Sequence, residues 1–183
     1  MIEVEVKFAL GDLDEARRRL LAAGAQPIGE RQFEDNRLYD DPAGSLRTAR
    51  RVLRLRTVGS RHLLTFKEGP TEVQDKSLYK EREELESEVA DGQTLHAVFL
   101  RLGYQVRWRY QKWRQSWRYD RLHLELDETP IGNFLELEGE PAVIDAVAER
   151  LGFDRSDYIT ASYRELYELL AGPEAGDLVF ESP

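Results

Sequence analysis

The chain of 183 residues carries a formal net charge of −9, and its residues are 41% hydrophobic and 33% charged. These values fit one globular domain, and they argue against a disordered chain, a chain with membrane-spanning helices and a general nucleic-acid-binding protein. The sequence has no cysteine and begins without the apolar segment of a signal peptide, which excludes disulfides and favours the cytoplasm.

Strands with two unlike faces dominate the sequence. Residues 2–8 alternate apolar and charged side chains with a period of two, which is typical of a strand between a core and a polar surface. The same pattern, bounded by turn residues, predicts further strands over 32–39, 51–57, 62–68, 78–89, 104–119, 122–127 and 133–138. The polar segment 69–77 contains Pro70 and is predicted to form a mobile loop.

Short amphipathic helices are expected between these strands. Asp12 is predicted to cap the first helix, with Glu15 at the third position of a capping box, and Gly24 ends it. Asp91 is predicted to cap a second helix. The inward face of this second helix is expected to comprise Leu95, Val98, Phe99 and Leu102.

The C-terminal part of the chain is expected to be helical before it frays. Pro141 fits the first turn of a third helix, and a short final helix is predicted over 162–170. We therefore expect one domain over residues 1–171, followed by a flexible tail over residues 172–183.

The polar faces of the predicted strands are charged, strand after strand. Residues two positions apart share a face of a strand, and these sets are Glu3 with Glu5 and Lys7, Arg54 with Arg56, Thr65 with Lys67, Arg82 with Glu84 and Glu86, Lys112 with Arg114, Glu125 with Asp127, and Glu136 with Glu138. A single pair has an ordinary explanation, because charged strand edges protect against aggregation. Seven sets together are harder to explain in this way. If the sheet curls into a barrel with these faces inward, its lumen has carboxylates on one side and cations on another. Such a lumen would suit a polyphosphate held by Lys and Arg, with a divalent cation held by carboxylates.

These residues resemble the triphosphate tunnel metalloenzymes of the CYTH superfamily. The resemblance begins at Glu3-x-Glu5-x-Lys7. It continues in order through 53–56 (LRLR), 64–69 (LTFKEG), 80–84 (KEREE), 112–114 (KWR), 126–132 (LDETPIG) and 134–139 (FLELEG). The last two segments look most like class IV adenylate cyclases, while thiamine triphosphatases and inorganic triphosphatases share the same core.

The resemblance implies an α+β fold, in which a closed antiparallel β-barrel of about eight strands forms a tunnel with flanking helices. It also implies a role for each matching residue. The implied ligands of Mg²⁺ or Mn²⁺ are Glu3, Glu5 and Glu138, with Asp127 and Glu136 as candidates for a second metal or for orienting the attacking group. The implied triphosphate-binding residues are Lys7, Arg54, Arg56, Lys67, Arg82, Lys112 and Arg114, with Glu84 positioning Arg82. The implied catalytic residues are Lys7, Arg56, Asp127 and Glu136.

One element of the family pattern is missing or altered. Some members carry a further lysine late in the chain, where this sequence has only Arg155 and Arg164 as cations. Neither arginine aligns clearly with that lysine, so the resemblance does not define the C-terminal end of the tunnel.

Two reactions fit this resemblance. If water attacks the terminal phosphorus, the protein is a metal-dependent triphosphatase acting on thiamine triphosphate, inorganic triphosphate or a nucleotide such as ATP. If the ribose 3′-hydroxyl of ATP attacks the α-phosphorus, it is a class IV adenylate cyclase that releases pyrophosphate. We favour hydrolysis, because it needs neither an adenine pocket nor an aligned ribose. A non-catalytic polyphosphate- or nucleotide-binding module is the alternative of another class, and a homodimer through an exposed barrel face is compatible with the sequence.

Overall fold

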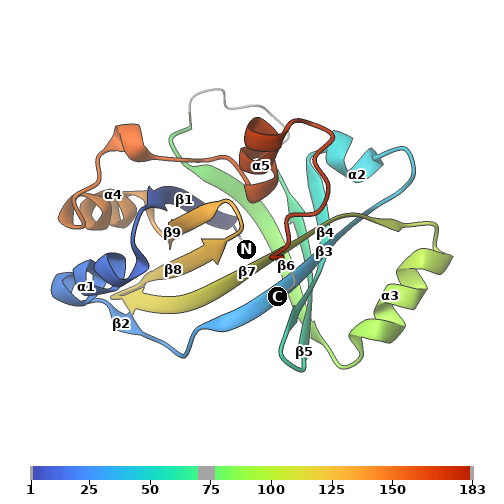
Figure 1. The fold of residues 1–183 in the computed structure, drawn as a ribbon, viewed down its shortest axis with the longest axis horizontal. Coiled ribbons are helices and arrows are strands. Elements are labelled where there is room, and N and C mark those ends of the chain that lie inside the picture. Colours follow the sequence, from blue (N-terminus) through green and yellow to red (C-terminus); the bar gives the residue numbers. More distant parts are fainter. Residues whose placement is uncertain (1, 70–76, 182–183) are drawn as a thin grey trace.

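The computed structural model describes residues 2–69 and 77–181, and it contains the expected strands and helices in the expected order (Figure 1). The expected mobile loop over 69–77 lies almost wholly outside the described residues. The strands are β1 (Ile2–Leu10), β2 (Gln26–Pro27), β3 (Gln32–Asp40), β4 (Arg51–Val58), β5 (Arg61–Glu68), β6 (Lys80–Val89), β7 (Gln105–Tyr119), β8 (Leu122–Thr129) and β9 (Gly132–Glu138). The helices are α1 (Leu13–Ala23), α2 (Ser45–Thr48), α3 (Gly92–Arg101), α4 (Pro141–Arg150) and α5 (Tyr163–Ala171), with a 3₁₀ turn over Arg155–Asp157.

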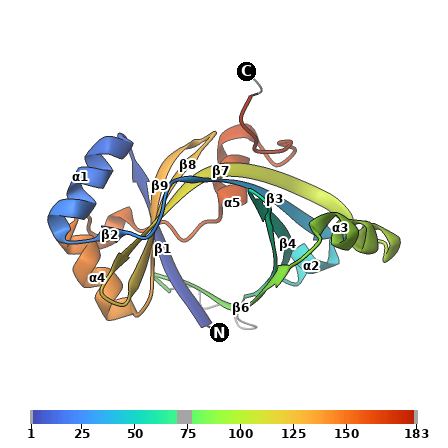
Figure 2. The same cartoon turned by 90° about the horizontal axis from the view of Figure 1, so that it is seen from below.

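Eight of the nine described strands form a closed antiparallel ring. Their order is β7-β3-β4-β5-β6-β1-β9-β8, and the pairing of β8 with β7 closes the ring. The two-residue strand β2 pairs with the C-terminal part of β7 and lies outside the ring. The predicted α+β fold with a closed barrel is therefore confirmed. Figure 2 shows the ring with α1 and α4 on one side and α3 on the opposite side. Among the described helices, none combines the length and apolar character that a membrane span needs.

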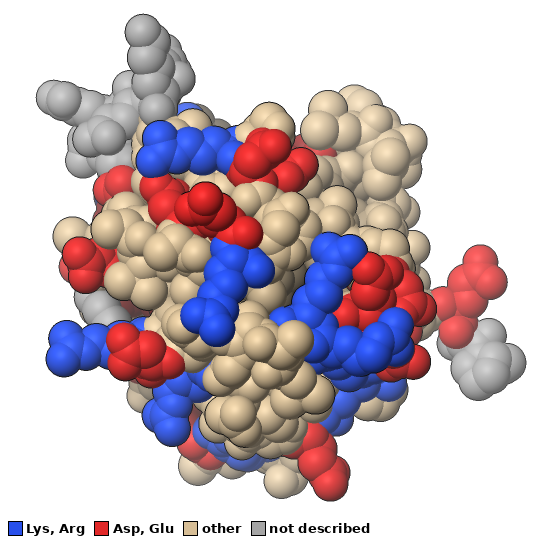
Figure 3. Space-filling view, turned by 90° about the vertical axis from the view of Figure 1, so that its left-hand side faces the viewer, with Lys and Arg blue, Asp and Glu red and all other residues tan. Residues whose placement is uncertain are grey.

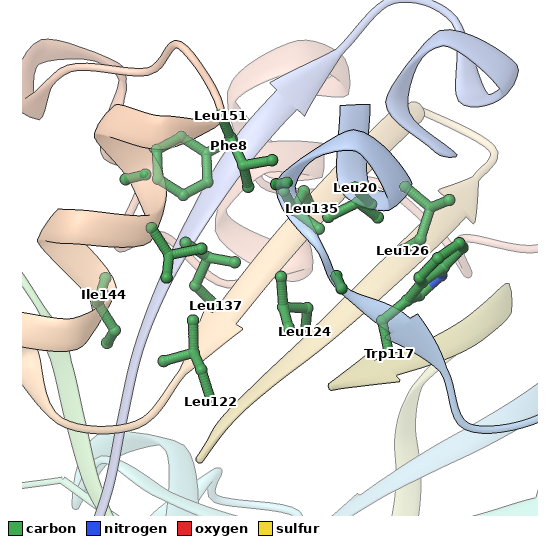
Figure 4. Packing of buried hydrophobic residues seen from close by; sticks show 14 of the residues in the cluster. Phe8, Leu20, Trp117, Leu122, Leu124, Leu126, Leu135, Leu137, Ile144 and Leu151 are labelled. Carbon is green, nitrogen blue, oxygen red and sulfur yellow. The ribbon is translucent and has the colours of Figure 1, made fainter. Parts of the chain in front are cut away.

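The hydrophobic core lies outside the ring, between its wall and the helices. The apolar faces of β1, β8 and β9 point outward and pack against α1 and α4, where Phe8, Leu124, Leu137 and Ile144 are fully buried (Figure 4). Burying each such side chain contributes about 2 kcal/mol. A second cluster, centred on Leu55, lies between α3 and the outer faces of β3 and β4. Because these two clusters use the outward faces, charged side chains can occupy much of the inward faces.

The caps of α1 follow the sequence. The Asp12 side chain accepts a hydrogen bond from the backbone amide of Glu15, and Gly24 takes a left-handed φ of 97° where the helix ends. Glu15 does not complete the expected capping box, because its carboxylate pairs with Arg19 instead. The helix start is thus predictable from Asp12 alone.

The predicted inward face of α3 is wider than the observed one. Asp91 caps the helix as expected, and Phe99 is buried against the barrel. Val98 and Leu102, however, are 43% and 67% exposed. An isolated helix on the outside of a barrel contacts the wall along one narrow stripe, so only part of its apolar surface is covered.

The expected frayed tail instead docks on β7. This long strand pairs with β3 over residues 105–114 but with β8 only from Trp113 onward, so its other edge is unpaired before that point. Leu178 fills this edge: its amide donates to the Arg109 carbonyl at 2.9 Å, and its carbonyl accepts from the Gln111 amide at 2.8 Å. The Leu178 side chain is 2% exposed and packs against Tyr110. Leu178 therefore extends the barrel wall along this edge of β7.

Candidate active site

The inward faces of the ring enclose a cavity of about 1080 Å³. Among the described residues, its lining includes thirteen Lys or Arg and ten Asp or Glu. The cavity therefore has an excess of cations inside a chain whose formal net charge is −9. Such a concave, cation-rich surface attracts polyanions.

The outside of the molecule differs from this cavity. On the face with α1 and α4, Lys and Arg lie beside Asp and Glu in small groups (Figure 3). Ion pairs outside the cavity include Arg17–Asp14 on α1 and the pair between Arg155 and Asp145 of α4. The described part of this face shows no broad cationic surface of the kind that binds nucleic acid.

The structure brings nearly all the residues singled out in the sequence into this one cavity. Those that line it are Glu3, Glu5, Lys7, Arg54, Arg56, Lys67, Arg82, Glu84, Lys112, Arg114, Glu136 and Glu138. Asp127 is absent from the lining, because it is fully buried behind other side chains. The two late arginines also separate: Arg164 lines the cavity, whereas Arg155 pairs with Asp145 at 2.6 Å on the outside.

One part of the cavity is acidic, and we call Glu3, Glu5, Glu84 and Glu138 the acidic cluster. Glu138 lies directly opposite Glu5 across the β1–β9 ladder, where like charges destabilise each other. Burial and the carboxylates of Glu3, Glu5 and Glu84 together raise the pKa of Glu138 to about 7. Carboxylate oxygens are the ligands that Mg²⁺ and Mn²⁺ prefer. A divalent cation bound here would relieve the repulsion between the carboxylates of the acidic cluster.

Two lysines stand among these carboxylates. Lys67 lies 2.6 Å from Glu3 and 3.2 Å from Glu84, and Lys80 forms a close ion pair with Glu5. Among the described residues, no three acidic or histidine side chains converge on one point as a preformed metal site. Lys80 lines the cavity although it was not among the predicted site residues. Its position next to Glu81 and Arg82 in a strand is the signal that could have indicated it.

A second part of the cavity is a buried network around Asp127. Both carboxylate oxygens of Asp127 accept hydrogen bonds from Arg114, at 2.7 and 2.6 Å, and one of them also accepts from Lys112 at 2.9 Å. Glu136 accepts from Lys7 at 2.7 Å and pairs closely with Arg114. Burial alone would raise the pKa of Glu136, but Lys7 and Arg114 hold it well below its usual range. These contacts indicate that Asp127 and Glu136 orient the neighbouring cations. They favour this role over the predicted role in binding a metal.

Tyr163 connects this network to α5. Its hydroxyl donates to Asp127 at 2.7 Å, and its ring lies 4.7 Å from the Lys7 ammonium and 5.3 Å from that of Lys112. Ser162 begins the helix with a complete capping box, which fixes the direction in which Tyr163 enters the barrel. Spacing alone did not indicate this residue, because its partners lie on other elements.

A third part of the cavity is cationic and lies on β4. Arg54 donates to the Tyr110 hydroxyl at 3.1 Å, and Arg56 lies 3.5 Å from Glu34, which is 4% exposed. The Nε atoms of both arginines are buried without a hydrogen-bond partner among the described residues. Glu34 was not among the predicted site residues, because residues 34–36 within the predicted strand are polar on both faces and do not indicate which face lines the cavity.

Comparisons with known proteins agree with this architecture. A family model described as the CYTH domain matches residues 1–163. A protein of Methanocaldococcus jannaschii named "Putative adenylate cyclase" is 27% identical over 177 residues, which cover 91% of this chain and 98% of that protein.

Two solved structures share the fold at low sequence identity. One, a "putative adenylate cyclase" from Vibrio parahaemolyticus, is 18% identical with a TM-score of 0.77, and the match covers 92% of this chain and 98% of that one. The other, a "putative adenylyl cyclase" from Hippeastrum described as having a dominant triphosphatase activity, is 19% identical with a TM-score of 0.64. That match covers 93% of this chain and 96% of the Hippeastrum chain.

Proposed function

The chain belongs to the CYTH domain family, and from this premise we propose that it is a divalent-metal-dependent enzyme that hydrolyses a small triphosphate. The observation that carries the proposal is the division of one cavity into an acidic cluster and a set of buried cations. A metal–triphosphate complex has the complementary division, with a cation bound along a chain of negatively charged oxygens.

The cations are suited to hold the phosphate chain. Arg54, Arg56, Lys112 and Arg114 line the cavity from β4 and β7, and Lys7 lines it from β1. The planar guanidinium groups of the arginines can bind two phosphate oxygens at once. Asp127 and Glu136 orient Lys7, Lys112 and Arg114 through their ion pairs.

The acidic cluster is suited to hold the metal. Glu3, Glu5 and Glu138 would bind Mg²⁺ or Mn²⁺ through their carboxylate oxygens. The raised pKa of Glu138 indicates that nearby cations do not offset the negative charges around it. A divalent cation there would neutralise the phosphate charge and polarise the bond that breaks. Arg82, on the same strand as Glu84, lines the cavity and is available to the phosphate chain.

The contacts of the three tryptophans favour hydrolysis over cyclisation. Trp108 is 4% exposed, stacks on Tyr110 and donates to the Gly176 carbonyl at 3.1 Å, so its faces are occupied by protein. Trp113 packs against Phe33 and Arg31, and Trp117 belongs to the outer core. All three tryptophans are engaged by other parts of the protein, so we assign none of them to an adenine.

The reaction products decide between these activities. Purified protein would be incubated with ATP, thiamine triphosphate or tripolyphosphate, with Mg²⁺ or Mn²⁺ and with a metal-free control. Orthophosphate as the released product supports the proposal. Cyclic AMP with pyrophosphate would instead establish the cyclase, the activity that the name of the Methanocaldococcus jannaschii relative suggests. Tight binding of tripolyphosphate without turnover of any of these substrates would indicate a binding module.

A further inference from the structure

Two lysines occupy the oxygen atoms that a metal ion would need. Lys67 donates to both carboxylate oxygens of Glu3, at 2.8 and 2.6 Å, and Lys80 pairs closely with Glu5. Both lysines line the cavity, with side chains 14% and 18% exposed. A cation that binds these oxygens of Glu3 and Glu5 therefore competes with two ammonium groups.

The other lysines of the cavity are held differently. Lys7 is paired with Glu136 at 2.7 Å and Lys112 with Asp127 at 2.9 Å, and neither carboxylate belongs to the acidic cluster. Both lysines are also covered by the ring of Tyr163. Moving either one would leave a buried carboxylate with one cation fewer, which is strongly unfavourable. Lys67 and Lys80 differ, because a metal ion could replace them at the same oxygens.

Charge balance favours this exchange. The two lysines together carry the same charge as one divalent cation, so the acidic cluster stays neutralised to the same extent when the cation replaces both. A lysine has a compact ammonium on a flexible four-carbon stem, so its charge can swing to a new partner inside the cavity. The oxygens of a bound triphosphate are the anions that would receive it.

We propose that Lys67 and Lys80 are exchangeable counter-ions, which neutralise the acidic cluster in the ligand-free protein and transfer to the phosphates when a divalent cation binds. The inference rests on the proposed function, because it concerns the same metal and the same triphosphate. Its consequence is coupled binding. The lysines compete with the metal until phosphates engage them, so each ligand strengthens the binding of the other by the same factor.

Calorimetric titration of the full chain with Mn²⁺, without any phosphate, tests this directly. Lys67→Met and Lys80→Met each remove a competitor, so both variants should bind Mn²⁺ about ten-fold more tightly than the wild type, as expected for the loss of one charged hydrogen-bonded pair. The same variants, titrated with tripolyphosphate without metal, should bind it more weakly than the wild type. Opposite changes for the two ligands would not arise from a purely structural role.

Lys112→Met is the matched control. It removes the same charge from the same cavity, but its partner Asp127 lies outside the acidic cluster. Its affinity for Mn²⁺ should stay close to that of the wild type, whereas a general effect of cavity charge would raise the affinity of all three variants alike. Thermal unfolding of each variant shows whether it is folded.

A measurement on the wild type covers the case in which a variant does not fold. In NMR spectra of the lysine ammonium groups, Mg²⁺ alone should shift the signals of Lys67 and Lys80 and leave those of Lys7 and Lys112 in place. Unshifted Lys67 and Lys80 signals under saturating Mg²⁺ overturn the inference.

The outcomes separate the inference from the proposed function. The inference is overturned if Lys67→Met and Lys80→Met bind Mn²⁺ no more tightly than the wild type. It is also overturned if the affinity of Lys112→Met for Mn²⁺ rises as much as theirs. In both cases, hydrolysis of a triphosphate by the wild type would still support the proposed function. If neither the wild type nor any lysine variant binds Mn²⁺, the metal site itself is wrong and the proposed function falls with it.

Discussion

The hydroxyl of Tyr163 donates a hydrogen bond of 2.7 Å to Asp127, and this bond fastens α5 to the interior of the barrel. Asp127 is fully buried, and the same carboxylate orients Lys112 and Arg114. The docking of α5 and the orientation of Lys112 and Arg114 therefore depend on the same buried carboxylate. Burial and Asp127 raise the pKa of Tyr163 well above its usual value, so its hydroxyl remains a donor throughout the ordinary pH range.

Tyr163→Phe should destabilise the protein by about 1–2 kcal/mol, because it removes this hydrogen bond and keeps the ring over Lys7 and Lys112. Denaturation by urea, followed by circular dichroism, measures the loss. Tyr167→Phe on the same helix is the control, since no hydrogen bond of its hydroxyl is seen among the described residues. Equal stability of both variants would show that the bond to Asp127 does not hold α5.

The sequence predicts the inward faces of the barrel well, because strand alternation is a local property. Glu3, Glu5 and Lys7 lie on the cavity face of β1, as do Arg54 and Arg56 on that of β4. Alternation requires only the two-residue period of a strand, and each of these segments keeps it without interruption. The closed order of eight strands came from the family resemblance, since no local pattern contains the pairing of β8 with β7.

The contacts within the cavity were not predictable in the same way. Lys80 meets Glu5 because of the register between β6 and β1, which the spacing within either strand does not define. Glu125 and Asp127 share a face of β8, yet only Glu125 lines the cavity, because Tyr163 from a distant helix covers Asp127. Such outcomes depend on which elements meet and not on the pattern of one element.

Substitutions at Asp127 and Glu138 should separate the carboxylate that orients cations from the one that binds the metal. Asp127→Asn should lower turnover about 100-fold by misplacing Lys112 and Arg114, while the affinity of the protein for Mn²⁺ stays close to that of the wild type. Glu138→Gln should instead weaken Mn²⁺ binding about ten-fold or more, because it removes a charged ligand. Calorimetry and phosphate release measure the two effects. A large loss of Mn²⁺ affinity in Asp127→Asn would return Asp127 to the metal ligands.

The buried Glu34 should make stability depend on pH in the acid range. Burial alone would raise its pKa, but Lys112, Arg56 and Arg114 lower it from 4.5 to about 2. A carboxylate whose pKa is lower in the folded state stabilises the fold fully above its unfolded pKa, and this contribution is lost as the pH falls from 4.5 toward 2.

Glu34→Gln tests this linkage. The wild type should exceed the variant in free energy of unfolding by on the order of 3 kcal/mol at pH 7, and the difference should shrink as the pH falls through that window. Urea denaturation at a series of pH values measures it. Glu88→Gln is the control, because Glu88 pairs with Arg61 on the exposed surface, where ion pairs contribute little. A difference that does not vary with pH would contradict the prediction.

The docking of the tail on β7 predicts that Leu178 contributes to stability. This residue lies within the segment 172–183, which the sequence predicts to be flexible. Leu178 is 2% exposed and its backbone fills the unpaired edge of β7, so Leu178→Ala should cost about 2–4 kcal/mol by opening a cavity beside Tyr110. Leu169→Ala is the matched control, because Leu169 is 82% exposed on α5 and its truncation removes almost no buried surface. Urea denaturation compares the two variants. If Leu178→Ala unfolds at the same urea concentration as Leu169→Ala, the tail does not form part of the barrel wall.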